Sequence, residues 1–125
     1  MDINLPEVHA ELTALFAVYE DALVHNRIDV LDTLFWSSEH TVRYGVAESL
    51  HGIEAIRAFR AARPAHGLAR TLHNTVITTF GRDAATAMAE FHREGSNKVG
   101  RQSQTWLRLP QGWRIVAAHV SLASD

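Results

Sequence analysis

The sequence predicts one α+β domain in which three N-terminal helices precede a meander of long antiparallel strands. In the first half of the chain, apolar residues recur at three- and four-residue steps, as on one face of a helix. The second half carries runs rich in threonine, valine and alanine, separated by short turn sequences. No repeat or low-complexity linker divides the 125 residues, so we expect a single domain over residues 1–125. A curved, mixed, mostly antiparallel sheet around the first helix would leave a pocket at its open end.

The three predicted helices have recognisable starts and ends. The first begins near Asn4 and Pro6 and runs to about His25. The second begins at a capping Asp29, and the third ends at Pro64. The apolar positions that define them are Val8, Leu12, Leu15, Phe16, Tyr19 and Leu23 in the first, Val30, Leu31, Leu34 and Phe35 in the second, and Ile53, Ile56 and Phe59 in the third.

The strands fall into two groups, with two short ones before the third helix and four long ones after it. Strand-favouring residues and glycine-containing turns set their limits. Because helices come first and long strands last, the order favours an α+β fold over a parallel α/β sheet. The predicted strands are His40–Tyr44, Val46–Leu50, Thr71–Phe80, Ala84–Glu94, Val99–Leu109 and Trp113–Leu122.

Composition excludes several functional classes. Twelve Lys and Arg against fourteen Asp and Glu give a net charge of -2, so we expect no nucleic-acid partner. Cysteine is absent, which excludes disulfides, thiolate catalysis and Fe–S ligation. Residues 1–6 contain no basic region followed by a long apolar run, as a secretory signal would. No apolar run approaches the ~20 residues of a membrane span. We therefore expect a cytoplasmic protein that does not enter a membrane.

Two side chains stand out as candidates for chemistry. Tyr19 lies on the apolar stripe of the first helix. It is either a tyrosine of the core, or a tyrosine whose ring packs in the core while its hydroxyl faces the pocket. Arg43 lies between Val42 and Tyr44, and side chains alternate along a strand. If its neighbours point inward, Arg43 is a surface residue. If Arg43 itself faces the pocket, it is a guanidinium without an obvious local acid, suited to an anionic ligand.

The last two strands offer further candidates for the pocket. Gln104 shares a face of its strand with Gln102 and Trp106, and that face points either into the pocket or to solvent. On the last strand, His119 and Ser121 share a face with Trp113, Ile115 and Ala117, so both follow apolar residues into a core or a cavity. For His119 the pattern alone favours a core histidine.

Cofactor motifs are missing from the sequence. The eight histidines form no H-E-x-x-H or similar ligand spacing, so we expect no metal. There is also no glycine-rich phosphate loop and no G-x-S-x-G elbow, and we expect no cofactor.

Several strings in the chain carry a family resemblance. Together they make the sequence similar to the AtzH-like branch of the SnoaL-like, nuclear-transport-factor-2-like superfamily over nearly its whole length. The closing Gly-Trp-Arg-Ile-Val pattern is shared across the superfamily, whereas two other strings are specific to this branch. The strings are Leu5–Val8, Phe35–Trp36, His40–Gly45, Gly52–Pro64, Gly100–Trp106 and Gly112–Ser121, of which His40–Gly45 and Gly100–Trp106 are the specific ones.

The resemblance implies a cone-shaped fold and a homodimer packed through the outer face of the sheet. It also implies a decarboxylating amidohydrolase that converts 1,3-dicarboxyurea to allophanate in cyanuric acid (s-triazine) catabolism. A carboxybiuret amidase and its small subunit are the associated partners. The family's proposed catalytic tyrosine and arginine match Tyr19 and Arg43 in this sequence.

These implications suggest roles for the candidates. Arg43 would bind a substrate carboxylate through two parallel hydrogen bonds, and Tyr19 would supply a proton to the nitrogen that loses carbon dioxide. In a hydrolytic variant, the same two residues would stabilise an oxyanion after attack by water. Gln104, His119 and Ser121 would orient the urea oxygen or a water. The alternatives are a non-catalytic dimeric scaffold for the amidase, and the same chemistry on another N-carboxy or oxalurate-type compound.

Overall fold

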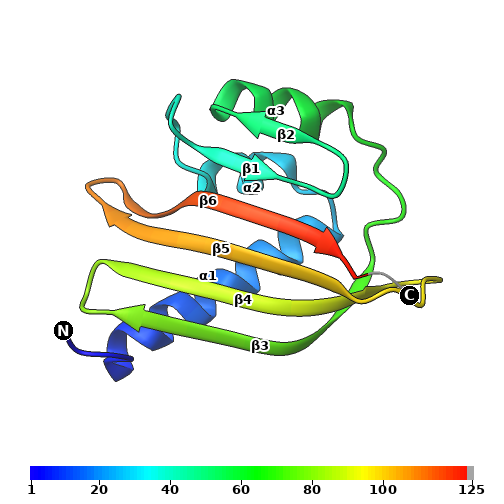
Figure 1. Ribbon diagram of the computed structural model, residues 1–125. Helices are drawn as coiled ribbons and strands as arrows, with labels where there is room; N and C mark the ends of the chain where they lie inside the picture. Colours follow the sequence, from blue (N-terminus) through cyan, green and yellow to red (C-terminus); the bar gives the residue numbers. More distant parts are fainter. Residues whose placement is uncertain (124–125) are drawn as a thin grey trace.

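A computed structural model describes residues 1–123 of the chain, and its architecture confirms the predicted α+β class. Over these residues the chain forms three helices and one six-stranded sheet, in which α1 runs along one face and α2 and α3 lie toward the β1–β2 end (Figure 1). The elements are α1 (Pro6–Val24), α2 (Ile28–Leu34), β1 (Val42–Tyr44), β2 (Ser49–His51), α3 (Ile53–Ala62), β3 (Arg70–Phe80), β4 (Ala84–Arg93), β5 (Gly100–Leu109) and β6 (Gly112–Leu122).

The sheet is mixed, as expected. Its strand order is β2-β1-β6-β5-β4-β3, so the hairpin of β1 and β2 joins the edge formed by the last strand of the chain. β1 runs parallel to β6, while the other neighbouring strands pair antiparallel. This parallel pairing places residues of β1 beside the open end of the sheet, where β6 ends.

The first helix begins and ends where local chemistry requires it. Pro6 occupies the first turn, where a missing N–H costs no hydrogen bond. The helix ends at Val24 because Asn26 adopts a left-handed conformation (φ 52°), which asparagine tolerates. The prediction that Asp29 caps α2 is wrong. The Arg27 N–H bonds directly back to the first helix, so α2 already begins one residue before Asp29.

The hydrophobic core lies between α1 and the inner face of the sheet. The inward residues of β4 are mainly alanines, whereas α1 presents larger apolar side chains. Small residues on one surface leave room for large ones on the other, so the layers can interlock. Residues that meet in this core include Val8, Leu12, Phe16, Phe35, Ala85, Ala87, Ala89, Trp106 and Ile115.

A β-bulge interrupts the pairing of β5 with β6. Thr105 pairs with Ala117, but Trp106 pairs with Ile115, which leaves Val116 as an extra residue in β6. A bulge of this kind breaks the alternation of side chains along the strand. In β6, therefore, odd-numbered residues face the core before the bulge and even-numbered residues face it afterwards.

This bulge corrects one sequence prediction. Ile115 faces the core before the bulge and Ala118 faces it afterwards. His119 and Ser121 consequently turn to the outer face of the sheet, where His119 is exposed. The prediction that these two residues share a face with Trp113 and Ile115 is wrong, because strict alternation assumed a regular strand.

No helix within the described part of the chain is both long enough and apolar enough to span a lipid bilayer.

Gly100 gives a test of the packing at the open end of the sheet. It pairs with Phe91 across β4 and β5, and a Cβ at position 100 would overlap the buried Phe91 ring. We expect Gly100→Ala to lower the free energy of unfolding by about 1–3 kcal/mol through overpacking, measured by urea denaturation. In the double variant Gly100→Ala/Phe91→Leu the loss should be smaller than the sum of the two single losses. A Gly100→Ala protein of unchanged stability would contradict this packing.

Candidate functional site

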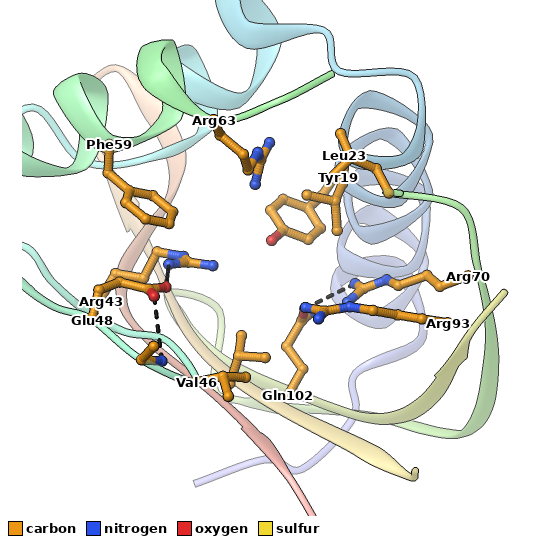
Figure 2. A pocket seen from close by; sticks show the side chains of 13 residues that line it. Tyr19, Leu23, Arg43, Val46, Glu48, Phe59, Arg63, Arg70, Arg93 and Gln102 are labelled. Carbon is orange, nitrogen blue, oxygen red and sulfur yellow. Dashed lines mark hydrogen bonds and ion pairs between the residues drawn. The ribbon is translucent and has the colours of Figure 1, made fainter. Parts of the chain in front are cut away.

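A cavity of about 230 Å³ opens between α1, α3, the β1–β2 turn and the inner face of β5. Its polar lining consists of four arginines, one glutamate, one tyrosine and one glutamine, and apolar side chains complete the wall (Figure 2). Such a set of side chains is rich in hydrogen-bond donors and positive charge. The polar residues are Tyr19, Arg43, Glu48, Arg63, Arg70, Arg93 and Gln102.

Tyr19 combines both of the roles that the sequence left open. Its ring is buried on α1, stacked on Phe16 and tilted against Phe35, so packing holds the phenol in one orientation. Its hydroxyl points into the cavity (Figure 2). A tyrosine whose ring is held by apolar packing and whose hydroxyl faces the cavity is placed to donate a proton to a bound ligand.

Arg43 reaches the same cavity from β1. Tyr44 is exposed on the outer face, so the alternation of the strand turns Arg43 inward, with its side chain only 12% exposed. Its guanidinium lies over the Phe59 ring and donates from Nη1 to Glu48 Oε1 at 3.0 Å. The sequence indicated no local acid for Arg43, and this was wrong, because the turn after β1 folds back and brings Glu48 to the guanidinium.

Gly45 permits this ion pair. The Gly45 N–H donates to the Glu48 carbonyl at 2.9 Å, which closes the turn. A Cβ at position 45 would overlap the Glu48 carboxylate and come within 3.1 Å of Arg43 Nη1. The carboxylate can therefore lie against the turn only because residue 45 has no side chain. The hairpin spacing of these residues was the one sequence signal that could have predicted the pair.

A second ion pair is buried on the opposite wall. The Arg70 side chain is 4% exposed and donates from Nε and Nη2 to the Glu20 carboxylate at 2.9 and 2.7 Å. Nη2 also donates to Gln102 Oε1 at 2.9 Å, and the guanidinium lies over the Phe91 ring. Neither Glu20 nor Arg70 was found by sequence reasoning, because the two residues are 50 positions apart and no local pattern relates them.

Arg63 adds a partly desolvated positive charge to the cavity. Its Nη2 donates to Asn26 Oδ1 at 3.4 Å, while its Nε is buried without a partner among the described residues. Burial lowers the pKa of the Arg63 guanidinium, and the positive charges of Arg60 and Arg43 lower it further. Arginine nevertheless stays protonated at neutral pH, so the charge remains and favours an anion nearby.

The cavity therefore carries more positive than negative charge. Within residues 1–123, Glu48 pairs with Arg43 and Glu20 with Arg70, but neither Arg63 nor Arg93 forms an ion pair with a carboxylate. Unmatched guanidinium groups in a partly buried site attract anionic ligands. No group of three His, Asp or Glu side chains in this part of the chain is arranged to hold a metal ion.

Gln104 lies in the core and does not line the cavity. It is fully buried, and its Oε1 accepts a hydrogen bond from Trp106 Nε1 at 3.0 Å. Gln102, two residues earlier on the same face of β5, lines the cavity instead. The alternation predicted the correct face of the strand. Which residue of that face lines the cavity depends on how α1 and α3 pack, and no pattern within the strand shows this.

His119 and Ser121 lie on the outer face, on the far side of the sheet from the cavity. There the His119 ring contacts the edge of the Tyr44 ring, and Ser121 pairs with Arg101 of β5. Of the five site residues predicted from the sequence, the structure brings Tyr19 and Arg43 into one cavity. It separates the other three from that cavity.

Comparisons with known proteins support one family. The AtzH-like family model matches residues 1–125 of the chain. The crystal structure of a protein with unknown function from Pectobacterium atrosepticum is 62% identical, with 98% of this chain and 96% of that chain covered and a TM-score of 0.97. A cystatin-like fold protein from Burkholderia xenovorans is 50% identical, with 100% and 98% covered and a TM-score of 0.95.

A more distant structure shows the same fold. A nuclear transport factor 2-like superfamily protein from Salmonella enterica is 26% identical, with 95% of this chain and 93% of that chain covered and a TM-score of 0.77. No curated protein matches the chain. The fold is therefore of the cystatin-like, nuclear transport factor 2-like type, three helices on a curved mixed sheet.

The buried pair of Glu20 and Arg70 can be tested by stability. We expect Glu20→Ala to lower the free energy of unfolding by about 3–5 kcal/mol, because Arg70 would remain buried without its carboxylate. Glu54→Ala, which removes a solvent-exposed partner of Arg57 on α3, is the control and should have a much smaller effect. Urea denaturation measures both. Equal losses in the two variants would show that the Arg70 pair carries no special stability.

Proposed function

The chain belongs to the AtzH-like family, and we propose that it is a decarboxylating amidohydrolase that converts 1,3-dicarboxyurea to allophanate. The observation that supports this proposal most is the convergence of the Tyr19 hydroxyl and the Arg43 guanidinium in one cationic cavity of about 230 Å³. The proposed substrate is a small planar dianion, a urea with one carboxylate on each nitrogen. Its charge and size suit a cavity with excess guanidinium groups.

The reaction needs one proton at one nitrogen. Arg43 binds a carboxylate through charge-assisted hydrogen bonds, and Tyr19 donates its hydroxyl proton to the adjacent urea nitrogen. The bond between that nitrogen and the carboxylate carbon then breaks, and its electron pair stays on nitrogen while carbon dioxide leaves. The dianion and one proton thus yield the allophanate monoanion and carbon dioxide. Water returns a proton to the tyrosine oxygen for the next turnover.

The Arg43–Glu48 pair favours a hydrolytic route as the second candidate. Glu48 lies in the cavity 3.0 Å from Arg43, so a carboxylate is available to accept a proton from an attacking water. Water would add to the carboxylate carbon, and Tyr19 and Arg43 would stabilise the negative charge on the oxygens of the adduct. The bond from this carbon to the urea nitrogen would then break, and the nitrogen would take up the proton that Glu48 accepted from water. This route releases bicarbonate first, and the organic product is again allophanate.

The metabolic setting is proposed on family membership alone. We place the reaction in the cytoplasm, within cyanuric acid breakdown. There a carboxybiuret amidase and its small subunit would supply the dicarboxylated urea.

The outer face of the sheet supports a homodimer. Val76 on β3 and Met88 on β4 are about half exposed (55% and 47%), although both are large apolar side chains. A hollow on this face is lined by Met88, His119 and Ser121 among others. Exposed apolar residues gathered on one face of a sheet are typical of an association surface. We propose that a second copy of the chain covers it.

Tyr19→Phe tests the proton donor. Only a hydroxyl is lost, so the fold should remain, while turnover should fall by ~10²-fold or more. The measurement is allophanate formation from 1,3-dicarboxyurea generated in situ by a carboxybiuret amidase, corrected for spontaneous decay.

In the same assay Arg43→Lys should also lose activity, because an ammonium cannot form the planar two-point contact with a carboxylate. Unchanged turnover in Tyr19→Phe would remove Tyr19 from the reaction. A wild-type protein without any acceleration would instead favour a non-catalytic scaffold.

Met88→Glu tests the dimer. A charge in the apolar outer face should convert the protein from dimer to monomer, measured by light scattering after size exclusion, with the circular dichroism spectrum unchanged. Val18→Glu is the matched control, because Val18 is an exposed apolar residue on α1, away from the outer face of the sheet. It should leave the dimer intact. A wild-type monomer at micromolar concentration would contradict this proposal.

A further inference from the structure

We propose that Gln102 and Arg93 form a second carboxylate subsite, oriented by the buried Glu20–Arg70 ion pair, across the cavity from Arg43. The identity of the ligand as a dicarboxylated urea rests on the proposed function. The subsite itself is inferred from unpaired donors in the cavity wall. It would make the protein select dianions over monoanions.

The orientation of the Gln102 amide is fixed by its neighbour. A guanidinium has donors only, so the atom of Gln102 that meets Arg70 Nη2 at 2.9 Å must be the oxygen. The amide nitrogen Nε2 is therefore the remaining end, and it is buried without a hydrogen-bond partner among the described residues. Gln102 is 3% exposed and lines the cavity. A buried donor of this kind calls for an acceptor, which a ligand oxygen would provide.

Arg70 cannot turn away to release the amide. Two of its nitrogens bond to the Glu20 carboxylate, and its guanidinium lies over the Phe91 ring, with 4.4 Å between Cζ and the ring centroid. The charge of Arg70 is also matched by Glu20. Arg70 is therefore a positioning residue, which directs Gln102 rather than binding the ligand by an unmatched charge.

Arg93 supplies the unmatched charge. It pairs with Arg70 across β3 and β4, so the two side chains lie on the same face of the sheet and run toward Gln102 (Figure 2). Like charges opposite one another repel, and Glu20 compensates only one of them. Within residues 1–123 Arg93 forms no ion pair with a carboxylate, and it is exposed at the rim of the cavity. An anion beside Gln102 would remove this repulsion.

The two carboxylate subsites lie on opposite sides of the cavity. Figure 2 shows Arg43 and Glu48 on one side, Arg93 and Gln102 on the other, and the Tyr19 hydroxyl directed between them. A dianion can contact both sides at once, whereas a monoanion contacts one. Loss of carbon dioxide would remove one of the two contacts, and the product would bind more weakly than the substrate.

Binding of a stable dicarboxylate tests the subsite without any reaction. Glutarate has the same number of atoms between its carboxylates as 1,3-dicarboxyurea, and butyrate is the same chain with one carboxylate removed. We expect the wild-type protein to bind glutarate at least ~10-fold more tightly than butyrate in isothermal titration calorimetry. Gln102→Leu and Arg93→Gln should each weaken glutarate binding by ~10-fold.

Two further variants control for folding. Gln102→Glu keeps an oxygen for Arg70 but removes the amide donor, so it should lose glutarate binding even if Gln102→Leu folds poorly. Gln104→Leu removes a matched glutamine on the same face of β5, whose Nε2 is likewise buried and unpaired but which does not line the cavity. This variant should bind glutarate like the wild type.

The outcomes separate this inference from the proposed function. Equal glutarate affinity in the wild type and both Gln102 variants would overturn the subsite, as would a wild type that binds no glutarate at millimolar concentration. Gln102-dependent binding without any allophanate formation would support the subsite and contradict the proposed reaction. Full allophanate formation by Gln102→Glu would leave the reaction standing and reject the subsite.

Discussion

The buried guanidinium of Arg70 joins four elements at the open end of the sheet. Arg70 begins β3, pairs with Glu20 of α1, bonds to Gln102 of β5 and lies over Phe91 of β4. Because a buried charge that loses its partner is strongly destabilising, these contacts fix the position of α1 along the sheet. Tyr19 precedes Glu20 in that helix, so the same ion pair that orders the wall of the cavity also sets the position of the phenol.

The two ends of the cavity differ in their charge balance. Arg43 is offset by Glu48, which the side-chain-free Gly45 accommodates, whereas Arg93 has no carboxylate partner among the described residues. Under the proposed function this difference has a chemical use. A departing carboxylate loses its charge as carbon dioxide forms, so strong binding of that group in the ground state would slow the reaction. The compensated end beside Arg43 suits the departing group, and the uncompensated end suits the group that remains.

The bulge at Val116 separates two surfaces of one sheet. Ahead of it, β6 contributes Ile115 to the core, and beyond it the inward positions belong to Ala118 and Val120. Val120 lines the cavity, while His119 turns to the outer face near the exposed Met88. One extra residue therefore assigns the polar end of the last strand to the outer, proposed dimer surface and leaves an apolar wall for the cavity.

The sequence by itself determined the helices, the strands, the α+β class and the buried stripe that carries Tyr19, because these depend on periodicity within one segment. Together with the family resemblance it also gave Arg43 as a candidate for the site. Only the tertiary structure decided which residues join them. Glu20 meets Arg70 across 50 positions and Arg70 meets Gln102 across 32, and such pairs leave no local pattern. Likewise the outward turn of His119 follows from pairing between β5 and β6, since a bulge is a property of two strands and alternation is a property of one.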